Sequence, residues 1–508
     1  MSDLNRREFL ASTCVAGAAL VGLPTTGTTA SGRVLGTNDA VRVGVIGLRG
    51  RGQLHMHMTT QIEGLRLAAL CDPDPAILAA AVRKAEQQGA KVAAFADVRK
   101  LLEWKDLDAV TIATPNHWQS LAAIWACQAG KDVYVEKPVS HNVWEGRQLV
   151  KAARKYRRMV QTGTQARANP DMIDGIAWLR AGNLGTVRYA LGFCYNPRLP
   201  IGKAGHGEIP AGLDYDLWTG PAPLKPLRRQ NLHYDWHWLY DYGNGDLGNQ
   251  GIHEMDIARW CLGYQELSPR VISIGGRLGY DDDAETPNTH LVYHEYNGPP
   301  ILFEVRGLPE SKQYQSDPNA WRKNMDTPEG FDLRHGIGVV VVCEQGRFVV
   351  IAGGRSVFAM DRQGKTIRRF DRDDPQHGRG WTKGDFGNFG SWLAAIRSRN
   401  PQDLKAEILE GHLSSALCHT GMISHRLGQQ MPAAEIRVNL SANRLLAERF
   451  VPLCEHLKHN GVDISKPVLT LGPQLSMDPQ TERFLDNPAA SGLLTRNDRA
   501  PFVVAEEV

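Results

Sequence analysis

Lys137 and His253 are the residues whose types and surroundings best suit acid–base chemistry. A lysine whose pKa is lowered by burial, or a neutral imidazole, can take up a hydroxyl proton near neutral pH. Loss of that proton must accompany the loss of hydride from a carbinol carbon. Asn249 precedes His253 by four residues, and Asp256 follows it by three, on one helical face where a carboxylate could orient the imidazole. Lys137, His253 and Asn249 are therefore the candidate catalytic residues; taken singly, the first two could equally be a surface lysine and a hydrogen-bonded core histidine.

These side chains need a scaffold, and the segment from Val41 to about Gly163 has the pattern of one. Strand-like runs alternate with helical runs, which is typical of a parallel sheet covered by helices on both faces. In such sheets ligands bind outside the carboxyl ends of the strands. The residues expected at that edge, because they directly follow strand-like runs, are Asp72, Thr114, Pro115, Asn116, His117, Glu136 and Lys137.

A glycine-rich stretch follows the first strand-like run and precedes a helical pattern. Gly47 would make the tight turn off the strand, and Gly52 would let the helix pack closely on the sheet. The N–H groups at the helix start would face a pyrophosphate. Arg49 stands where the dinucleotide fingerprint usually has glycine, with Gly50 beside it, and an arginine can compensate by pairing with phosphate. The four residues are candidate cofactor ligands; the alternative is a glycine turn without a ligand.

Asp72 ends the second strand-like run, Leu65 to Cys71, about 20 residues after the glycines. A carboxylate at this place can accept hydrogen bonds from the adenosine ribose hydroxyls and would repel a 2′-phosphate. The expected cofactor is therefore NAD rather than NADP. The alternative is an aspartate that only begins the turn before Pro73.

After about Gln165 several strand-like runs alternate polar and apolar residues, as in an antiparallel sheet. The predicted strands are 187–194, 271–274, 290–293, 301–305, 337–343 and 347–351, and the predicted helices are 172–181, 251–262, 389–398, 404–411 and 414–425. Residues 196–248 form a long irregular stretch rich in Trp, Tyr and His, whose rings suit either a sugar or the packing of the loop itself. Beyond about Met431 we expect a surface tail.

The composition is that of an ordinary globular chain, with 508 residues, 42% hydrophobic residues and a net charge of +3. This charge is too small to indicate binding to nucleic acid or to an anionic membrane. None of the eight cysteines lies in a Cys-x-x-Cys pair, and most stand in apolar runs. We expect buried thiols rather than disulfides, and no metal site.

The N-terminus has a pattern of its own. Arg6-Arg7 precedes a short apolar run that ends at Leu23, and Thr28-Thr29-Ala30 follows. This pattern is typical of a twin-arginine signal peptide with an apolar run too short to span a bilayer, and the alternative is an amphipathic tail. The predicted localisation is periplasmic, by way of the twin-arginine export machinery and with no membrane span after processing. That route carries folded proteins, often with a cofactor already inserted.

Taken together, five motifs resemble those of the Gfo/Idh/MocA oxidoreductase family. They are Gly47-x-Arg-Gly-x-Gly52, Cys71-Asp72, Ala113-Thr-Pro-Asn-His117, Glu136-Lys-Pro138 and Gly251-x-His253-x-x-Asp256. The resemblance covers about Val41 to Gly428. It implies an α/β fold with an N-terminal Rossmann doubly wound parallel sheet and a C-terminal α/β domain with an open, mainly antiparallel sheet that commonly serves in oligomerisation, so a homo-oligomer is expected. It also implies that Lys137 and His253 line the site, with the nicotinamide between the domains and a sugar, polyol or related carbohydrate as substrate.

Asn249 departs from the family pattern, because the family's dehydrogenases commonly carry aspartate there. Three hypotheses follow. The first is an NAD-dependent oxidoreductase acting on a carbohydrate CH–OH group. The second is an exported NAD-dependent glycosidase or epimerase that oxidises its sugar transiently, as one branch of the family does, with no net redox change. The third is a non-catalytic carbohydrate-binding protein of the same fold.

The predicted organisation has four parts. They are a signal peptide at 1–32, an NAD-binding Rossmann domain at 39–164, a C-terminal α/β substrate and oligomerisation domain at 165–430, and a C-terminal extension at 431–508.

Overall fold

The computed structural model describes residues 40–203, 205, 207–315, 336–351, 353–370 and 381–508. The predicted signal peptide and Cys14 lie outside the described residues. The other seven cysteines are buried free thiols, as predicted: Cys71, Cys127, Cys194, Cys261, Cys343, Cys418 and Cys454. Among the helices that the structure describes, none combines the length and the apolar character needed to cross a membrane.

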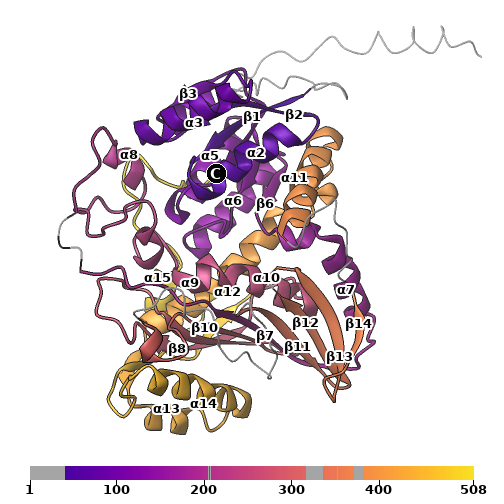
Figure 1. Ribbon diagram of the computed structural model, residues 1–508, viewed down its shortest axis with the longest axis vertical. Coiled ribbons are helices and arrows are strands. Elements are labelled where there is room, and N and C mark those ends of the chain that lie inside the picture. Colours follow the sequence, from indigo (N-terminus) through magenta and orange to yellow (C-terminus); the bar gives the residue numbers. More distant parts are fainter. Residues whose placement is uncertain (1–39, 204, 206, 316–335, 352, 371–380) are drawn as a thin grey trace, which may run out of the picture. The chain divides into compact units, whose positions relative to one another are not determined.

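The N-terminal domain is a six-stranded parallel sheet with the strand order β3-β2-β1-β4-β5-β6, which confirms the predicted doubly wound Rossmann sheet (Figure 1). Its strands are β1 (Val41–Ile46), β2 (Leu65–Cys71), β3 (Ala93–Phe95), β4 (Ala109–Ile112), β5 (Asp132–Val135) and β6 (Val160–Thr162). Its helices are α2 (Gly50–Gln61), α3 (Pro75–Gln87), α4 (Val98–Glu103), α5 (Asn116–Gln128) and α6 (Val143–Lys155).

Both faces of this sheet are covered, which is why its strands are continuous apolar runs rather than alternating ones. Helices α5 and α6 pack on one face, against Val110, Ile112 and Val133. The other face carries α2, α3 and also α11 (Trp381–Ser398), whose Phe389 and Trp392 belong to the same core cluster as Val41 and Val43 of β1 (Figure 1). A helix more than two hundred residues downstream of the sheet therefore completes the first domain.

The C-terminal domain is built on a mixed sheet in which β7 and β10 are parallel and the remaining described pairs are antiparallel. Its main path is β14-β13-β12-β11-β7-β10-β9-β8-β16-β15. The strands are β7 (Val187–Tyr195), β8 (Arg270–Gly276), β9 (Thr289–Glu295), β10 (Ile301–Arg306), β11 (Ile337–Cys343), β12 (Gly346–Ile351), β13 (Ser356–Asp361), β14 (Thr366–Arg369), β15 (Gln429–Met431), β16 (Leu469–Leu471), β17 (Leu475–Asp478) and β18 (Arg483–Phe484). The helices are η1 (Gln165–Ala168), α7 (Pro170–Arg180), α8 (Tyr215–Thr219), η2 (Asp235–Trp238), α9 (Gly245–Asn249), α10 (Gly251–Leu262), η3 (Lys312–Tyr314), η5 (Pro401–Asp403), α12 (Ile408–Arg426), α13 (Ala433–Asn439), α14 (Arg444–His459) and α15 (Pro488–Gly492).

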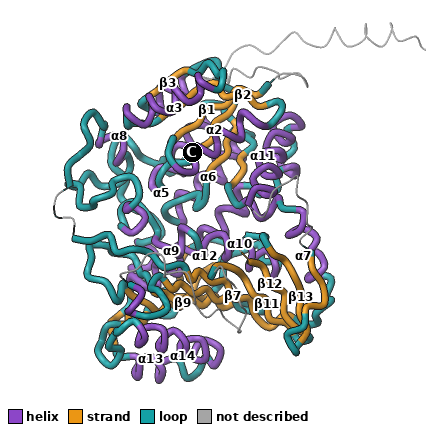
Figure 2. The backbone as a smooth tube through the Cα atoms, in the orientation of Figure 1, coloured by secondary structure: helices purple, strands orange, loops and turns teal. Residues whose placement is uncertain are grey.

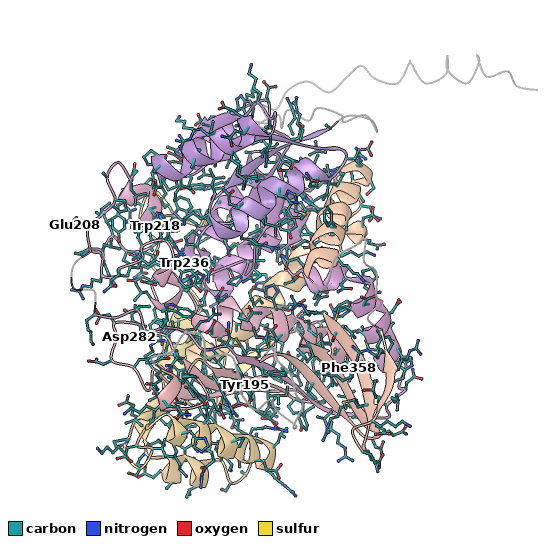
Figure 3. The ribbon with its side chains drawn as sticks, viewed as in Figure 1. Tyr195, Glu208, Trp218, Trp236, Asp282 and Phe358 are labelled. Atoms are coloured by element: carbon teal, nitrogen blue, oxygen red, sulfur yellow. The ribbon has the colours of Figure 1, made fainter. Side chains whose placement is uncertain are left out.

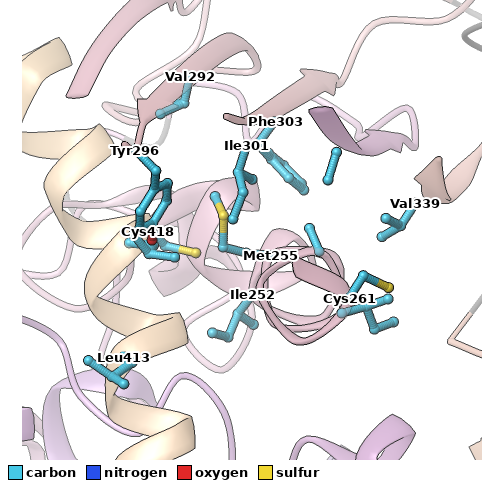
Figure 4. Close-up of a cluster of buried hydrophobic side chains, with 14 of the residues drawn as sticks. Ile252, Met255, Cys261, Val292, Tyr296, Ile301, Phe303, Val339, Leu413 and Cys418 are labelled. Atoms are coloured by element: carbon cyan, nitrogen blue, oxygen red, sulfur yellow. The ribbon is translucent and has the colours of Figure 1, made fainter. Parts of the chain in front are cut away.

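Helix α10 is the centre of this domain's core. Ile252, Met255 and Cys261 point from it toward the sheet and toward α12, where Leu413 and Cys418 meet them (Figure 4). The predicted helix 251–262 is confirmed, and Gly263 ends it in the left-handed conformation with φ +78°. Burial of α10 on both sides fixes the start of the helix, which carries His253 and is preceded by Asn249.

Two predictions about the C-terminal half are wrong. The helices expected at 404–411 and 414–425 are one helix, α12, in which Gly411 is an interior residue. Its glycine is needed for packing, since a β-carbon there would lie 2.2 Å from Thr162 Oγ1. The expected surface tail after Met431 instead contributes α14, whose Phe450 is fully buried on the sheet, and the strands β16 and β17, which both pair with β8.

Candidate functional site

A cavity of about 470 Å³ lies at the carboxyl ends of β1, β2, β4 and β5, and we call it the central cavity. This is the edge where ligands bind in doubly wound sheets, at the point where the strand order reverses. Two groups of residues in its wall carry the chemistry. The turn end consists of Gly47, Arg49, Gly50 and Asp72, and the lysine end consists of Lys137, His237 and Asn249.

The glycines of the turn end do what the sequence predicts. Gly47 has φ +81°, and a β-carbon on it would lie 2.8 Å from the carbonyl oxygen of Ala113. Gly52 lies beneath the turn, where a β-carbon would lie 1.9 Å from the carbonyl oxygen of Gly47. Gly50 begins α2 and has nothing within 4 Å of its β-carbon position, and no side chain of the described residues caps the helix. The first turn of α2 therefore presents open backbone to the cavity beside the exposed Arg49 side chain.

Asp72 is fixed to the turn rather than exposed beyond it. Its carboxylate accepts hydrogen bonds from the backbone N–H groups of Leu48 and Asp74, each at 3.0 Å. Burial raises the pKa of Asp72 to about 6, against the effect of these two bonds. Asp74 in turn pairs with His233 of the long irregular stretch at 3.0 Å. The carboxylate thus stands in the cavity wall with its orientation set by two backbone donors.

The residues after β4 divide between the wall and the interior. Thr114, Pro115 and Asn116 line the central cavity, and Thr114 Oγ1 is buried without a hydrogen-bond partner among the described residues. Asn116 donates its side-chain N–H to Asn244 Oδ1 at 3.0 Å. His117 is fully buried away from the wall, with Nε2 3.1 Å from the carbonyl oxygen of Trp218. Burial, assisted by the Arg496 charge, lowers the pKa of His117 to about 3.

Lys137 and Asn249 are brought together although 112 residues separate them in the chain. Lys137 Nζ donates to the backbone carbonyl of Asn249 at 2.7 Å and lies 3.5 Å from its side-chain Oδ1. Burial lowers the pKa of Lys137, against the attraction of the neighbouring Glu136 carboxylate. The ammonium form is therefore easier to deprotonate than that of an ordinary lysine, as general-base chemistry requires.

Glu136, also in the wall, belongs to a buried ion-pair network. Arg51 Nε lies 2.7 Å from Glu136 Oε1 and reaches Asp385 of α11 at 2.5 Å, and His55 Nε2 lies 3.0 Å from the same glutamate oxygen. Although burial opposes ionisation, the Arg51 guanidinium and His55 hold the pKa of Glu136 well below its usual range. The network anchors the backbone from which Lys137 projects.

His253 stands near Lys137 but is not among the residues of the cavity wall. It is 7% exposed, and burial, reinforced by the Lys137 ammonium, holds its pKa well below the usual range. Asp256, which we considered as its orienting carboxylate, pairs with Arg167 at 2.8 Å and accepts a hydrogen bond from Ser414 at 2.7 Å. This carboxylate therefore neutralises a buried arginine.

The long irregular stretch contributes one wall of the cavity, and we call its described residues 207–248 the aromatic loop (Figure 2). Its Trp218 and Trp236, labelled in Figure 3, both line the cavity, together with Leu217, Tyr234 and His237. The loop is held to α5, where Trp118 Nε1 donates to the carbonyl oxygens of Leu217 and Trp218 at 3.0 and 3.1 Å.

The C-terminal segment around Phe502 packs against Trp118 and stabilises this contact. Phe502 is 1% exposed and packs edge-to-face on Trp118 at 5.4 Å between ring centroids. The guanidinium groups of Arg99 and Arg499 each lie 5.1 Å from the Phe502 ring. Arg499 also donates to the Asp216 carboxylate at 2.6 Å, which ties the aromatic loop to the C-terminal segment.

Several residues of the site were not found from the sequence. Arg51 pairs with Glu136 across 85 residues of chain and with Asp385 across 334 residues, and no local pattern signals such pairs. His237 lies in the stretch that the sequence shows to be rich in Trp, Tyr and His. Its signal was the concentration of rings in a long loop, which could not show which ring faces the cavity.

The sheet order and the glycine turn define a two-domain protein with a dinucleotide-binding Rossmann domain. Residues 41–164 match the family described as "Oxidoreductase family, NAD-binding Rossmann fold", and residues 194–321 match "Oxidoreductase family, C-terminal alpha/beta domain". The chain belongs to the Gfo/Idh/MocA oxidoreductase family, as the sequence motifs predict, and its first domain is an NAD-binding domain.

Named relatives and solved structures extend this comparison. The chain is 36% identical over 171 residues to glycosyl hydrolase family 109 protein 2 of Shewanella sp. strain ANA-3. It is 31% identical over 177 residues to the alpha-N-acetylgalactosaminidase of Shewanella oneidensis. Both matches cover 30% of this chain and 38% of the relative. A levoglucosan dehydrogenase in complex with NADH shares the fold, with a TM-score of 0.55 at 16% identity over 76% of this chain and 96% of that one.

The residues present fit an NAD cofactor. The open start of α2 and the empty space at Gly50 can accommodate a pyrophosphate, and the fixed Asp72 carboxylate can accept from ribose hydroxyls. Thr114 Oγ1 is a buried hydroxyl whose hydrogen-bonding capacity no described residue fills.

Proposed function

We propose that this protein uses NAD to oxidise a CH–OH group of a sugar, polyol or related carbohydrate. The observation that carries the proposal is the central cavity, in which one wall holds both a dinucleotide turn and Lys137 Nζ with its lowered pKa. Bound NAD supplies the ring that accepts a hydride. Gly47, Gly50 and Arg49 would hold its pyrophosphate, and Asp72 would hold its ribose.

The chain's own part of the reaction is proton transfer and positioning. Lys137 Nζ donates to two oxygens of Asn249, and within the described part of the chain its third direction has no hydrogen-bond partner and can face the substrate oxygen. Lys137 takes the hydroxyl proton as the carbon–hydrogen bond breaks. The Trp218 and Trp236 faces and the aromatic loop exclude water from this end of the cavity. His253, which lies near Lys137 but outside the cavity wall, takes part in the same proton transfer.

A second function is favoured by the names of the relatives and by Asn249. In a glycosidase working by transient oxidation, the hydride returns to the substrate and no net redox change occurs. An amide at residue 249 positions Lys137 without adding a negative charge there. Export by the twin-arginine route, with NAD inserted before export, would suit this cycle, because the cofactor need not dissociate. A periplasmic location and assembly into a homo-oligomer are part of the same proposal.

One experiment separates the two functions. The protein is purified after export, its bound small molecules are identified by mass spectrometry, and it is then mixed with N-acetyl-D-galactosamine, D-galactose or p-nitrophenyl N-acetyl-α-D-galactosaminide. Accumulation of reduced nicotinamide with a free sugar supports the oxidoreductase. Release of p-nitrophenol without accumulation of reduced nicotinamide supports the glycosidase. Failure to bind NAD at all refutes both.

A further inference from the structure

His237 is one of two histidines that line the central cavity, and the other, His233, pairs through Nε2 with Asp74. His237 stands in η2, within the aromatic loop, and shares the cavity wall with Lys137 and Asn249. Its ring is stacked on Trp236, with centroids 3.7 Å apart and 21° between the planes, and the Tyr234 ring lies 4.9 Å away. The ring plane is therefore fixed by the loop before any substrate arrives.

The hydrogen bond of His237 decides which of its nitrogens can serve a ligand. Nδ1 lies 2.5 Å from the backbone carbonyl oxygen of Tyr234. A carbonyl oxygen can only accept, so Nδ1 carries the hydrogen in the neutral ring and Nε2 carries the lone pair. Among the residues that the structure describes, Nε2 has no hydrogen-bond partner of its own. The ring thus offers one acceptor from a fixed position.

The surroundings keep this acceptor neutral. Burial lowers the pKa of His237 to about 3, and the charges of Lys137 and Arg198 act in the same direction, against the hydrogen bond to Tyr234. An imidazole that stays neutral near pH 7 is a weak base, but its unprotonated nitrogen can accept a hydrogen bond. It is also complementary to Lys137, a hydrogen-bond donor that lines the same cavity.

We infer that His237 is a specificity-determining residue whose Nε2 accepts a hydrogen bond from a substrate hydroxyl other than the one that reacts at Lys137. The inference rests on the proposed function and deepens it, because it names the substrate class. The cavity selects polyhydroxy compounds over counterparts in which that hydroxyl is removed or methylated. A site built to bind a hydroxyl discriminates strongly against an analogue that lacks it, since the site's own polar group is then left unpaired.

The test compares p-nitrophenyl N-acetyl-α-D-galactosaminide with its monodeoxy derivatives on the intact, NAD-loaded protein. We expect one derivative to be turned over with kcat/KM lower by about 30-fold, the value of one hydrogen bond whose loss leaves the acceptor unpaired. His237→Phe keeps a ring on Trp236 but has no acceptor, so the parent and that derivative should then react almost equally. His237→Gln regains an acceptor and should restore part of the difference, whereas His459→Ala, which removes an exposed histidine of α14, should leave the full difference.

Where the glycosides are turned over, two results overturn the inference. One is a His237→Phe variant that discriminates as strongly as the wild type. The other is a histidine nitrogen spectrum of the ¹⁵N-labelled, NAD-loaded protein in which His237 is protonated at Nε2 near neutral pH. The spectrum also decides the case if the wild type turns over none of the glycosides. An Nδ1–H tautomer whose Nε2 shifts on addition of N-acetyl-D-galactosamine then supports His237 as the acceptor, although the proposed reaction has failed. An Nε2 that does not shift refutes it.

Discussion

The two ends of the central cavity are made in different ways. At the turn end, Gly47, Gly50 and Asp72 belong to one strand–turn–helix–strand unit, and backbone conformation does most of the shaping. At the lysine end, Lys137 and Asn249 meet across 112 residues, and His237 arrives on a loop from the second domain. The residues expected to bind the cofactor are therefore positioned by one short segment of the chain. The residues expected to act on the substrate are positioned by the packing of distant segments.

The largest effect should follow the loss of Lys137. Lys137→Met keeps the length of the side chain but cannot exchange a proton, so we expect turnover of the substrate identified above to fall by about a thousandfold. NAD affinity should stay within about twofold, because the turn end does not depend on this side chain. Steady-state kinetics and equilibrium binding of NAD measure the two effects. Lys151→Met, which changes an exposed lysine of α6, is the matched control.

If Lys137→Met weakened NAD binding as much as turnover, the lysine end would also bind the cofactor, and the two ends would not have separate roles. If it left turnover intact, Lys137 would have no part in proton transfer.

The cavity wall at Trp118 of α5 depends on a distant segment of the chain. Phe502 lies at the far end of the chain but packs behind Trp118, which lines the cavity. Phe502→Ala removes a fully buried ring and its contacts with two guanidinium groups, so the free energy of unfolding should fall by about 3 kcal/mol. Chemical denaturation measures it, with Val503→Ala as control, because Val503 is 46% exposed. An equal loss in both variants would mean that the C-terminal segment is not anchored through Phe502.

Gly52 allows the start of α2 to pack closely against the turn at Gly47. In Gly52→Ala the new β-carbon would lie 1.9 Å from the carbonyl oxygen of Gly47, so the turn and the start of α2 must separate. We expect NAD affinity to fall by about 100-fold, since the N–H groups of that helix start no longer converge on the pyrophosphate. Gly390→Ala in α11 places its β-carbon in open space and should leave NAD affinity unchanged. Normal binding by Gly52→Ala would show that the helix start is not the phosphate site.

The same division explains what could be predicted from the sequence. The parallel sheet covered by helices and the conformational roles of Gly47 and Gly52 follow from patterns within a few tens of residues, and the structure agrees with them. The pairing of Arg51 with Glu136 and Asp385, and the position of Phe502, depend on chain segments that meet only after folding. Gly411 illustrates the error in the other direction, because this glycine signals a helix end locally but lies inside α12, where a β-carbon would collide with Thr162.

The smallest effect concerns Asp72, whose pKa is raised to about 6 by burial. Its ionised form is the stronger acceptor for the ribose hydroxyls, by about 1 kcal/mol over a neutral group, so NAD affinity should fall about fivefold as the pH is lowered through about 6. The sign follows from the raised pKa, because the carboxylate takes up a proton within this range while an ordinary aspartate stays charged. In Asp72→Asn the affinity should be lower throughout and independent of pH over the same range. Calorimetric titration with NAD at several pH values measures the difference between the two proteins. A wild-type affinity that does not change through about pH 6 would mean that the ribose is held by backbone groups alone, which would make the turn end still more a product of local conformation than the lysine end.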